Sequence, residues 1–206
     1  MSSPTPVAAF DLDGTLTRRD TLLPFLIHLV GWRGMLAGSP TLLPVLAAYA
    51  VGLMSNSRAK EAVFARFLAG RPLAEFNRRC EAFADARLPA LMRPRMLARL
   101  DWHRRQGHRC LIVSASMENY ILPWALAAGF EAVIATRLAV ADGRLSGRYY
   151  GGNCYGEEKA RRLRAWLGER DGVEVYAYGD SRGDREMLAL ADHAYYRQIP
   201  GEMQDG

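Results

Sequence analysis

The stretch FDLDGTLT, residues 10–17, decides the fold of this chain, and it directly follows the apolar run VAA at residues 7–9. A short apolar run that ends in a glycine turn is typical of a buried strand leading into a loop. In an open α/β sheet such a loop lies at the carboxyl end of the strand, where ligands bind. Asp11 and Asp13 are two positions apart, so on an extended chain both carboxylates point to one face. The stretch therefore predicts two carboxylates in one pocket.

Two carboxylates held this close repel each other unless a cation lies between them or one carries a proton. Both outcomes indicate chemistry rather than packing. The alternative is a solvated turn or a helix cap, which the pattern Asp-x-Asp-Gly also fits. On its own, this motif leaves the two interpretations open.

Length and composition limit the class of protein. The 206 residues suffice for one sizeable domain or one core with an insertion, and half of them are hydrophobic, which is typical of a globular protein. The net charge of +5 suits an anionic ligand or an anionic membrane surface. No nucleic acid is expected, because the Arg residues are spread along the chain without a binding motif. Three unpaired cysteines and an N-terminus without a secretory pattern predict a cytoplasmic protein.

Strand and helix patterns alternate through the second half of the chain. Strands are predicted at 110–113, 132–135, 174–178 and 194–196, helices at 118–128, 157–167 and 184–191, and a hairpin at 137–150 around Asp142-Gly143. This order predicts an α/β fold, a doubly wound parallel sheet of Rossmann-like type. Residues 17–105 break the rhythm. We therefore expect a core formed by 1–16 and 106–206 and a helical cap inserted at 17–105.

The first part of that insertion, residues 21–57, is unusually apolar, and residues 35–57 carry no charge at all. Its length raises the possibility of a transmembrane helix. Helix-breaking residues interrupt it at Gly38, Pro40, Pro44 and Gly52, which favours two shorter helices or a bent hairpin. Basic residues follow at Arg58, Lys60 and Arg66, as they do beside membrane-surface segments. Three interpretations remain open: a packed helical subdomain, contact with a membrane surface, and a spanning helix.

Polar side chains of complementary kinds follow the predicted strands or begin the helices behind them: Asp11, Asp13, Ser114, Lys159, Asp180 and Asp184. A parallel sheet brings its strand ends to one edge, so these groups can converge. Taken singly, Ser114 and Asp184 would be helix caps and Lys159 a solvated side chain. Together, the carboxylates suit Mg²⁺, and the lysine and hydroxyl suit phosphoryl oxygens. The set predicts metal-assisted phosphoryl transfer with an aspartate nucleophile.

These residues resemble the motifs of haloacid-dehalogenase-like (HAD) hydrolases of the phosphoserine-phosphatase-like branch. The motif D-x-D-x-T is matched at residues 11–15, the hydroxyl motif at Ser114, the lysine at Lys159, and G-D-x-x-x-D at residues 179–184. The motifs occur in the family's order and span nearly the whole chain. The place of the insertion is also the place where this branch carries its helical cap.

The resemblance implies roles for individual residues. Asp11 would attack phosphorus, Asp13 would act as acid and base, and Lys159 would complete the catalytic set. Phosphate would be bound by Thr15, Ser114, Ala115 and Lys159. Mg²⁺ would be held by Asp11, Asp13 (through its backbone carbonyl), Asp180 and Asp184, the last directly or through water or Lys159.

The substrate is less defined than the reaction. Asp20 stands where phosphoserine phosphatases usually carry a glutamate, and Asp20 and Arg58 are candidate substrate-binding residues. The expected reaction is hydrolysis of a small phosphorylated metabolite, such as a phosphoserine-like or amino-alcohol phosphate. The long apolar cap is similar to that of phosphatidylglycerophosphatase C, so the alternative is a lipid phosphate phosphatase at the inner face of a membrane, in contact with it through residues 21–57. A hypothesis of another class is a phosphate-binding or membrane-surface module without catalysis.

Overall fold

The computed structural model describes residues 4–168 and 172–198. Within them, a six-stranded sheet has the order β4-β3-β2-β1-β5-β6. The strands are β1 (Val7–Phe10), β2 (Arg109–Met117), β3 (Ala132–Ala141), β4 (Arg144–Tyr150), β5 (Val175–Gly179) and β6 (His193–Tyr196). All neighbouring strands pair in parallel except β3 and β4, which form an antiparallel hairpin. The predicted α/β fold with a Rossmann-like, predominantly parallel sheet is confirmed.

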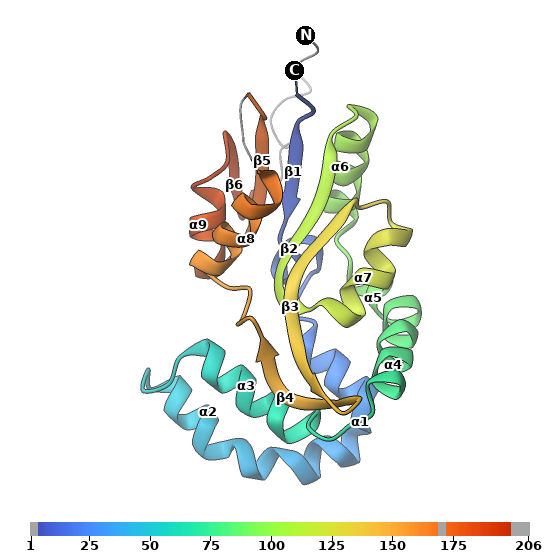
Figure 1. Ribbon diagram of the computed structural model, residues 1–206, viewed down its shortest axis with the longest axis vertical. Helices are drawn as coiled ribbons and strands as arrows, with labels where there is room; N and C mark the ends of the chain where they lie inside the picture. The colour runs from blue at the N-terminus through green and yellow to red at the C-terminus, as the bar shows by residue number, and fades with distance from the viewer. Residues whose placement is uncertain (1–3, 169–171, 199–206) are drawn as a thin grey trace.

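The central strand β1 is buried on both faces, which explains its continuous apolar sequence. Val7 and Ala9 face a core cluster formed with α8 and α9, whereas Ala8 and Phe10 face the larger cluster formed with α6 and α7. The side chains alternate because successive strand residues point to opposite faces. Helices therefore cover both faces of the sheet (Figure 1).

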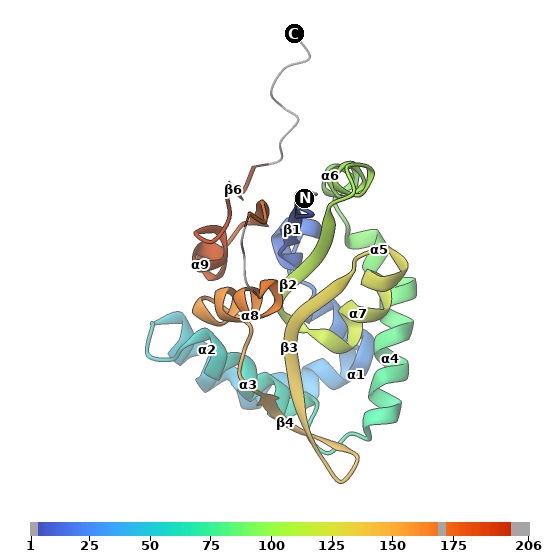
Figure 2. The same cartoon turned by 45° about the horizontal axis from the view of Figure 1, so that its top comes forward.

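The helical elements fall into two sets. Those between β1 and β2 are η1 (Leu12–Leu16), α1 (Leu22–Gly38), η2 (Ser39–Leu42), α2 (Leu43–Ala50), α3 (Asn56–Phe67), α4 (Leu73–Ala86), α5 (Leu88–Leu91) and α6 (Pro94–Arg105). Those that follow β2 are α7 (Glu118–Ala127), α8 (Glu157–Leu167), η3 (Arg182–Asp184) and α9 (Arg185–Leu188). Figures 1 and 2 show that α1, α2 and α3 lie beyond the carboxyl end of β1, away from its amino end.

The β3–β4 hairpin extends from the sheet and packs against the inserted helices. Leu145 of β4 exchanges backbone hydrogen bonds with the segment after α3, donating to the carbonyl of Arg71 at 2.9 Å and accepting from Gly70 at 2.8 Å. Gly147 approaches α3 so closely that a Cβ there would lie 2.6 Å from the Cα of Ala65. The hairpin, although late in the chain, is thus part of the support for the helices over the sheet edge.

The packing bears on where a cap would begin and end. Helix α6 packs on β2, and α4 packs along α7, whereas β4 packs on α3. The division into a core at 1–16 and 106–206 and a cap at 17–105 therefore stays a prediction. The packing favours counting α6 with the core and the β3–β4 hairpin with the cap.

The apolar segment 21–57 folds as helices that bend. The segment Leu22–Ala50 contains an 18-residue window that is long and apolar enough, by length and composition, to cross a membrane. The mean hydropathy is 1.2, and 22% of the window is buried. The chain turns at Gly31, whose φ is +69°, and again through η2. The 3-10 segment confirms the predicted interruption near Gly38 and Pro40, whereas the turn at Gly31 was not among the predicted breaks. Large apolar side chains remain exposed on it: Leu23, Trp32, Leu36, Leu43, Leu46, Tyr49, Val51 and Leu53.

Two elements differ from their sequence-based bounds. The strand predicted at 110–113 continues to Met117, because Ser114 and Met117 also pair with β3 across a bulge. The helix predicted at 184–191 is shorter: a 3-10 turn with a Ser181 cap precedes α9, which ends at Leu188. Both differences lie beside polar residues of the predicted site, where the local pattern is interrupted by side-chain hydrogen bonds.

Candidate active site

Asp11 lies at the carboxyl end of the central strand, directly after β1, and its carboxyl group is buried. Its backbone N–H continues the sheet by donating to the carbonyl of Tyr178 on β5 at 2.9 Å. Its Oδ1 accepts a hydrogen bond from the Lys159 ammonium at 2.5 Å. Burial, with a smaller contribution from Asp184, raises the pKa of Asp11 to about 7 against the opposing charge of Lys159. The strand thus places a carboxylate in a buried position beside a lysine ammonium.

Lys159 lies in the first turn of α8, which begins after Gly156, and it is among the largest fully buried side chains. Its ammonium contacts Asp11 Oδ1 and also Asp184 Oδ1, the latter at 2.6 Å. Burial alone would lower the pKa of Lys159, but the two carboxylates raise it above its ordinary value. A buried ammonium between two carboxylates remains charged and fixes both of them in place.

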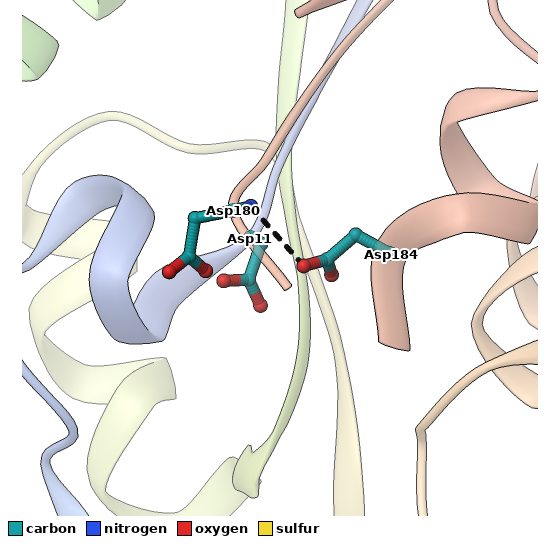
Figure 3. A group of neighbouring side chains, drawn as sticks. All are labelled: Asp11, Asp180 and Asp184. Carbon is teal, nitrogen blue, oxygen red and sulfur yellow. Dashed lines mark hydrogen bonds between the residues drawn. The ribbon is translucent and has the colours of Figure 1, made fainter. Parts of the chain in front are cut away.

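Asp180 completes a group of three carboxylates. Ligand oxygens of Asp11, Asp180 and Asp184 all lie within 4.8 Å of one another, and Figure 3 shows them converging from three segments of chain. Asp180 Oδ1 is buried without a hydrogen-bond partner, and burial together with Asp184 raises the pKa of this carboxyl. An unpartnered buried oxygen beside two carboxylates is costly unless a cation binds there. The donor set therefore fits a hard divalent cation such as Mg²⁺.

Asp184 is held more tightly than its two neighbours. Its Oδ2 accepts from the backbone N–H groups of Asp180 and Ser181 at 3.2 and 2.9 Å, and from the Ser181 hydroxyl at 2.7 Å. Burial would raise its pKa, but Lys159 and these hydrogen bonds lower it. Because both of its oxygens are occupied, Asp184 is placed to position Lys159 and the Asp180 loop.

Asp13 lies in the turn η1, where Gly14 adopts a φ of +83° and returns the chain toward the site. Its Oδ1 accepts two hydrogen bonds from Thr21, one from the backbone N–H and one from the hydroxyl, each of 2.7 Å. Its Oδ2 accepts from the Ser116 hydroxyl. Burial raises the pKa of Asp13, and the negative charge of Asp20 raises it as well. Ser116, Thr21 and Lys60 oppose this rise. On balance the pKa of this carboxyl lies above its ordinary value.

The predicted phosphate-binding residues line the same edge. Ser114 and Ala115 lie on β2, whose pairing places Ile112 beside Phe10, so that both reach the level of Asp11. Ser114 is fully buried, and the hydroxyl of Thr15 is buried without a partner. A cavity of about 220 Å³ is lined by Thr15, Arg93 and Asp180 among others, whereas Ser114 does not line it.

The two candidate substrate residues differ in position. Asp20 is exposed just before α1 and accepts from the backbone N–H of Leu22, and it influences the pKa of Asp13. Arg58 is exposed near the start of α3, where its backbone N–H bonds to Ser55. The cap residue that reaches the site is Lys60, whose ammonium donates to the carbonyl of Ala115 at 3.0 Å.

Four residues of the site were not predicted from the sequence: Thr21, Lys60, Ser116 and Tyr120. Tyr120 is buried on α7 and shares a 2.8 Å hydrogen bond with the Thr21 hydroxyl. Of these four, only Ser116 could have been found from the sequence, because it stands two positions after Ser114 on a strand and so shares its face. Thr21 and Lys60 reach the site through folding of the cap, and Tyr120 reaches it because α7 packs against the start of the cap. The local pattern encodes neither arrangement.

Comparison with known proteins agrees with this geometry. The model of the haloacid dehalogenase-like hydrolase family matches residues 8–189, which include all four motifs. The chain belongs to the haloacid dehalogenase-like hydrolase family. Its members share the core that the sheet order and the motif positions describe here.

Individual members of the family are similar over most of the chain. Protein CicA of Caulobacter vibrioides is 39% identical over 197 residues, which cover 95% of this chain and 87% of CicA. A Bordetella pertussis protein of unknown function has a TM-score of 0.78 at 26% identity, covering 91% of this chain and 87% of that one. A phosphoserine phosphohydrolase-like protein from Francisella tularensis has a TM-score of 0.64 at 18% identity, covering 91% and 84%, and therefore shows the fold alone.

Family membership identifies the protein as a hydrolase. The acidic group lies at the carboxyl edge of the sheet, and the buried ammonium of Lys159 contacts two of its members, Asp11 and Asp184.

Proposed function

We propose that the protein is a Mg²⁺-dependent phosphomonoester hydrolase that acts through a phosphoaspartate at Asp11. The observation that carries the proposal is the buried contact of Lys159 with both Asp11 and Asp184, beside an unpartnered oxygen of Asp180. A buried lysine that neutralises these carboxylates supports placing a dianionic phosphoryl group among them. The second close carboxylate, Asp13, is held separately by Thr21 and Ser116, which supports giving it the proton transfer.

In the first step, a carboxylate oxygen of Asp11 forms a bond to phosphorus while the bond from phosphorus to the leaving oxygen breaks. Asp13 donates its proton to that oxygen, so the alcohol leaves neutral. In the second step, water attacks the phosphorus of the aspartyl phosphate. Asp13 takes the proton of this water, and inorganic phosphate and the Asp11 carboxylate are released. Lys159 and Ser114 hold the phosphoryl oxygens, with Thr15 and the backbone at Ala115.

Mg²⁺ would be held by Asp11 and Asp180, with the backbone carbonyl of Asp13 and with Asp184 close by. When bound, it supplies positive charge for the phosphoryl oxygens and lowers the repulsion between phosphate and carboxylates. The partnerless Asp180 oxygen and the raised pKa values of Asp11 and Asp180 support this site. These groups favour a cation in place of protons.

The proposed substrate is a small phosphorylated metabolite, such as a phosphoserine-like or amino-alcohol phosphate, in the cytoplasm. Asp20 would bind an ammonium or hydroxyl group of the substrate, because its exposed carboxylate lies close enough to influence Asp13. Arg58 is the second proposed substrate contact. Its exposed side chain would have to turn toward the site as substrate binds.

A lipid phosphate is the second candidate substrate. Exposed apolar side chains on α1 and α2 favour it, among them Trp32 at 67%, Leu36 at 72% and Leu43 at 62% exposure. In this case the protein would lie peripherally at the inner face of a membrane and contact it through residues 21–57. Arg33 and Arg58 border the uncharged stretch and suit anionic lipid.

A phosphate-release assay with Mg²⁺ and a panel of phosphoserine, phosphoethanolamine, sugar phosphates and lipid phosphates tests the proposal. Asp11→Asn should lower turnover by at least about a thousandfold while retaining the melting temperature, because the amide does not form the acyl phosphate. Turnover by this variant close to that of the wild type would contradict the mechanism. An absence of Mg²⁺-dependent turnover over the whole panel would favour a binding module.

A further inference from the structure

A second cavity, of about 300 Å³, lies among the first helices of the cap. Its walls are almost entirely apolar and come from α1, η2, α2 and α3. The side chains that form most of it are Leu22, Leu26, Leu42, Leu46, Val63 and Phe67. Leu26, Leu42 and Phe67 are buried, whereas Leu46 is 44% exposed, so the cavity is closed on the core side and opens at the surface.

Two polar residues, Ser39 and Asp20, also line this cavity, and they differ in whether their polar group is available to a ligand. The Ser39 hydroxyl already donates to the carbonyl of Met35 at 2.6 Å. Asp20 brings a carboxylate to one end. A ligand filling the cavity therefore has an apolar body. A negatively charged group at this end would be repelled by Asp20.

The end that holds Asp20 adjoins the catalytic residues. Thr21, which donates both of its hydrogen bonds to Asp13, stands between Asp20 and Leu22, and these two line the cavity. Asp13 is the group proposed to protonate the leaving oxygen. The organic part of the ester is attached to that same oxygen, so it begins beside Thr21 and at the mouth of the cavity.

We infer that this cavity binds an alkyl or acyl chain on the leaving group of the substrate. The inference rests on the proposed phosphatase function and narrows the substrate to phosphomonoesters that carry an apolar chain. The phosphoryl group lies at Asp11, the polar linker passes Asp20, and the chain lies between α1 and α3. Leu46, which lines the cavity, also belongs to the exposed apolar face of α2, so a chain can enter from that face.

The test compares butyl, octyl and dodecyl phosphate, each kept below its aggregation concentration. If the chain is buried, kcat/KM rises by about two- to fourfold for each added methylene until the cavity is full. A second arm presents dodecyl phosphate in phosphatidylcholine vesicles. If the monomeric ester is turned over faster, the enzyme takes its substrate from free amphiphiles in solution. If the ester in vesicles is turned over faster, the enzyme takes its substrate from a bilayer. Equal kcat/KM for the three esters in solution, with no faster turnover of dodecyl phosphate in vesicles, would overturn the inference while leaving the phosphatase function intact.

Val63→Phe places a larger side chain in the cavity, and Val51→Phe is its matched control, because Val51 is 70% exposed and does not line the cavity. The ratio of kcat/KM for dodecyl over butyl phosphate should fall about tenfold in Val63→Phe and stay at the wild-type value in Val51→Phe. A ratio unchanged in both variants would contradict the assignment.

Binding of dodecylphosphonate and butylphosphonate to the wild type, measured by calorimetry, gives a readout that does not depend on turnover or on the folding of a variant. Tighter binding of the longer phosphonate supports the chain site even if no ester is hydrolysed, in which case the proposed function fails and the ligand class stands. Equal affinities would overturn the chain site.

Discussion

Thr21 donates two hydrogen bonds to one carboxylate oxygen of Asp13, from its backbone N–H and from its hydroxyl, each of 2.7 Å. The same hydroxyl is bonded to Tyr120 on α7 at 2.8 Å. One threonine therefore connects the proposed acid and base, the beginning of the cap and a core helix. The orientation of Asp13 depends on a residue outside the family motifs.

Replacing Thr21 by valine removes the hydroxyl but retains the shape of the side chain. A hydrogen bond to a charged group contributes about 1.5–3 kcal/mol, so we expect kcat to fall by about 10- to 100-fold. The hydroxyl also opposes the rise in the pKa of Asp13, so this pKa should rise further, and the alkaline limb of the rate profile should move to higher pH. Steady-state kinetics across pH measure both effects.

Thr21→Ser is the matched control, because it retains the hydroxyl and loses only a methyl group. We expect its kcat within about twofold of the wild type. A serine variant as slow as the valine variant would show that the methyl group, and not the hydrogen bond, positions Asp13.

Two basic residues of the cap differ in position: Lys60 reaches the site, whereas Arg58 is exposed. The Lys60 ammonium bonds to the carbonyl of Ala115 at 3.0 Å and opposes the rise in the pKa of Asp13. Lys60→Met should therefore lower kcat/KM by about tenfold. Arg58→Met, two positions away on the same helix, tests the other cap residue proposed to act at the site. In the free enzyme Arg58 is exposed, so an equal loss in Arg58→Met would mean that it turns toward the substrate, as proposed from the sequence.

The core of the fold could be predicted because each of its signals is local. A short apolar run ending in Asp11, a helix beginning at Glu157 and the hairpin around Asp142 are each encoded within a few neighbouring residues. Parallel pairing then carries these strand ends to one edge. The convergence of Asp11, Lys159, Asp180 and Asp184 follows from local patterns and one topological rule.

The cap could not be predicted in the same way, because its contacts depend on how helices pack. Lys60 meets Ala115 across 55 positions of sequence, and Tyr120 meets Thr21 across 99. The apolar composition of 21–57 is compatible with packing, membrane contact or both. The cavity lined by Leu26 and Val63 arises because α1 turns at Gly31 and the chain returns through α3, a path that periodicity does not specify.

His103 should make stability depend on pH below neutrality. It is fully buried on α6, with its ring nitrogens within hydrogen-bonding distance of Tyr178 and His108. Burial, together with the neighbouring charges of Arg99 and His108, lowers its pKa to about 3. The unfolded chain takes up a proton near pH 6.5, whereas the folded protein does so only near pH 3. Stability contributed by the neutral ring is therefore complete above pH 6.5 and is lost as the pH falls toward 3.

Urea unfolding between pH 7 and pH 4 measures this effect. The free energy of unfolding should fall by at most about 1.4 kcal/mol for each pH unit through His103 alone. His103→Gln removes the titrating group, so its curve should be flatter than that of the wild type, even if the variant is less stable at pH 7. Parallel curves would show that other groups account for the acid sensitivity.

Gly14 is required for a second reason besides its backbone conformation. Its φ is +83°, and a Cβ at this position would overlap the carboxylate of Asp180. Gly143, in the β3–β4 turn, has a similar φ of +71° but has no other atom within 4 Å of where its Cβ would lie. Alanine at either position costs about 1 kcal/mol of conformational strain, because L-residues rarely adopt this region. Only alanine at Gly14 also displaces Asp180.

We therefore expect Gly14→Ala and Gly143→Ala to lower the free energy of unfolding by similar amounts from strain, with a further loss in Gly14→Ala. Calorimetric titration should show Mg²⁺ affinity lowered more than about tenfold in Gly14→Ala and unchanged in Gly143→Ala, because one carboxylate ligand is moved in the first variant alone. Equal Mg²⁺ affinities in the two variants would mean that Asp180 does not bind the cation. Comparing the two variants thus distinguishes two reasons for a glycine: the backbone conformation, and the space that the proposed metal site requires.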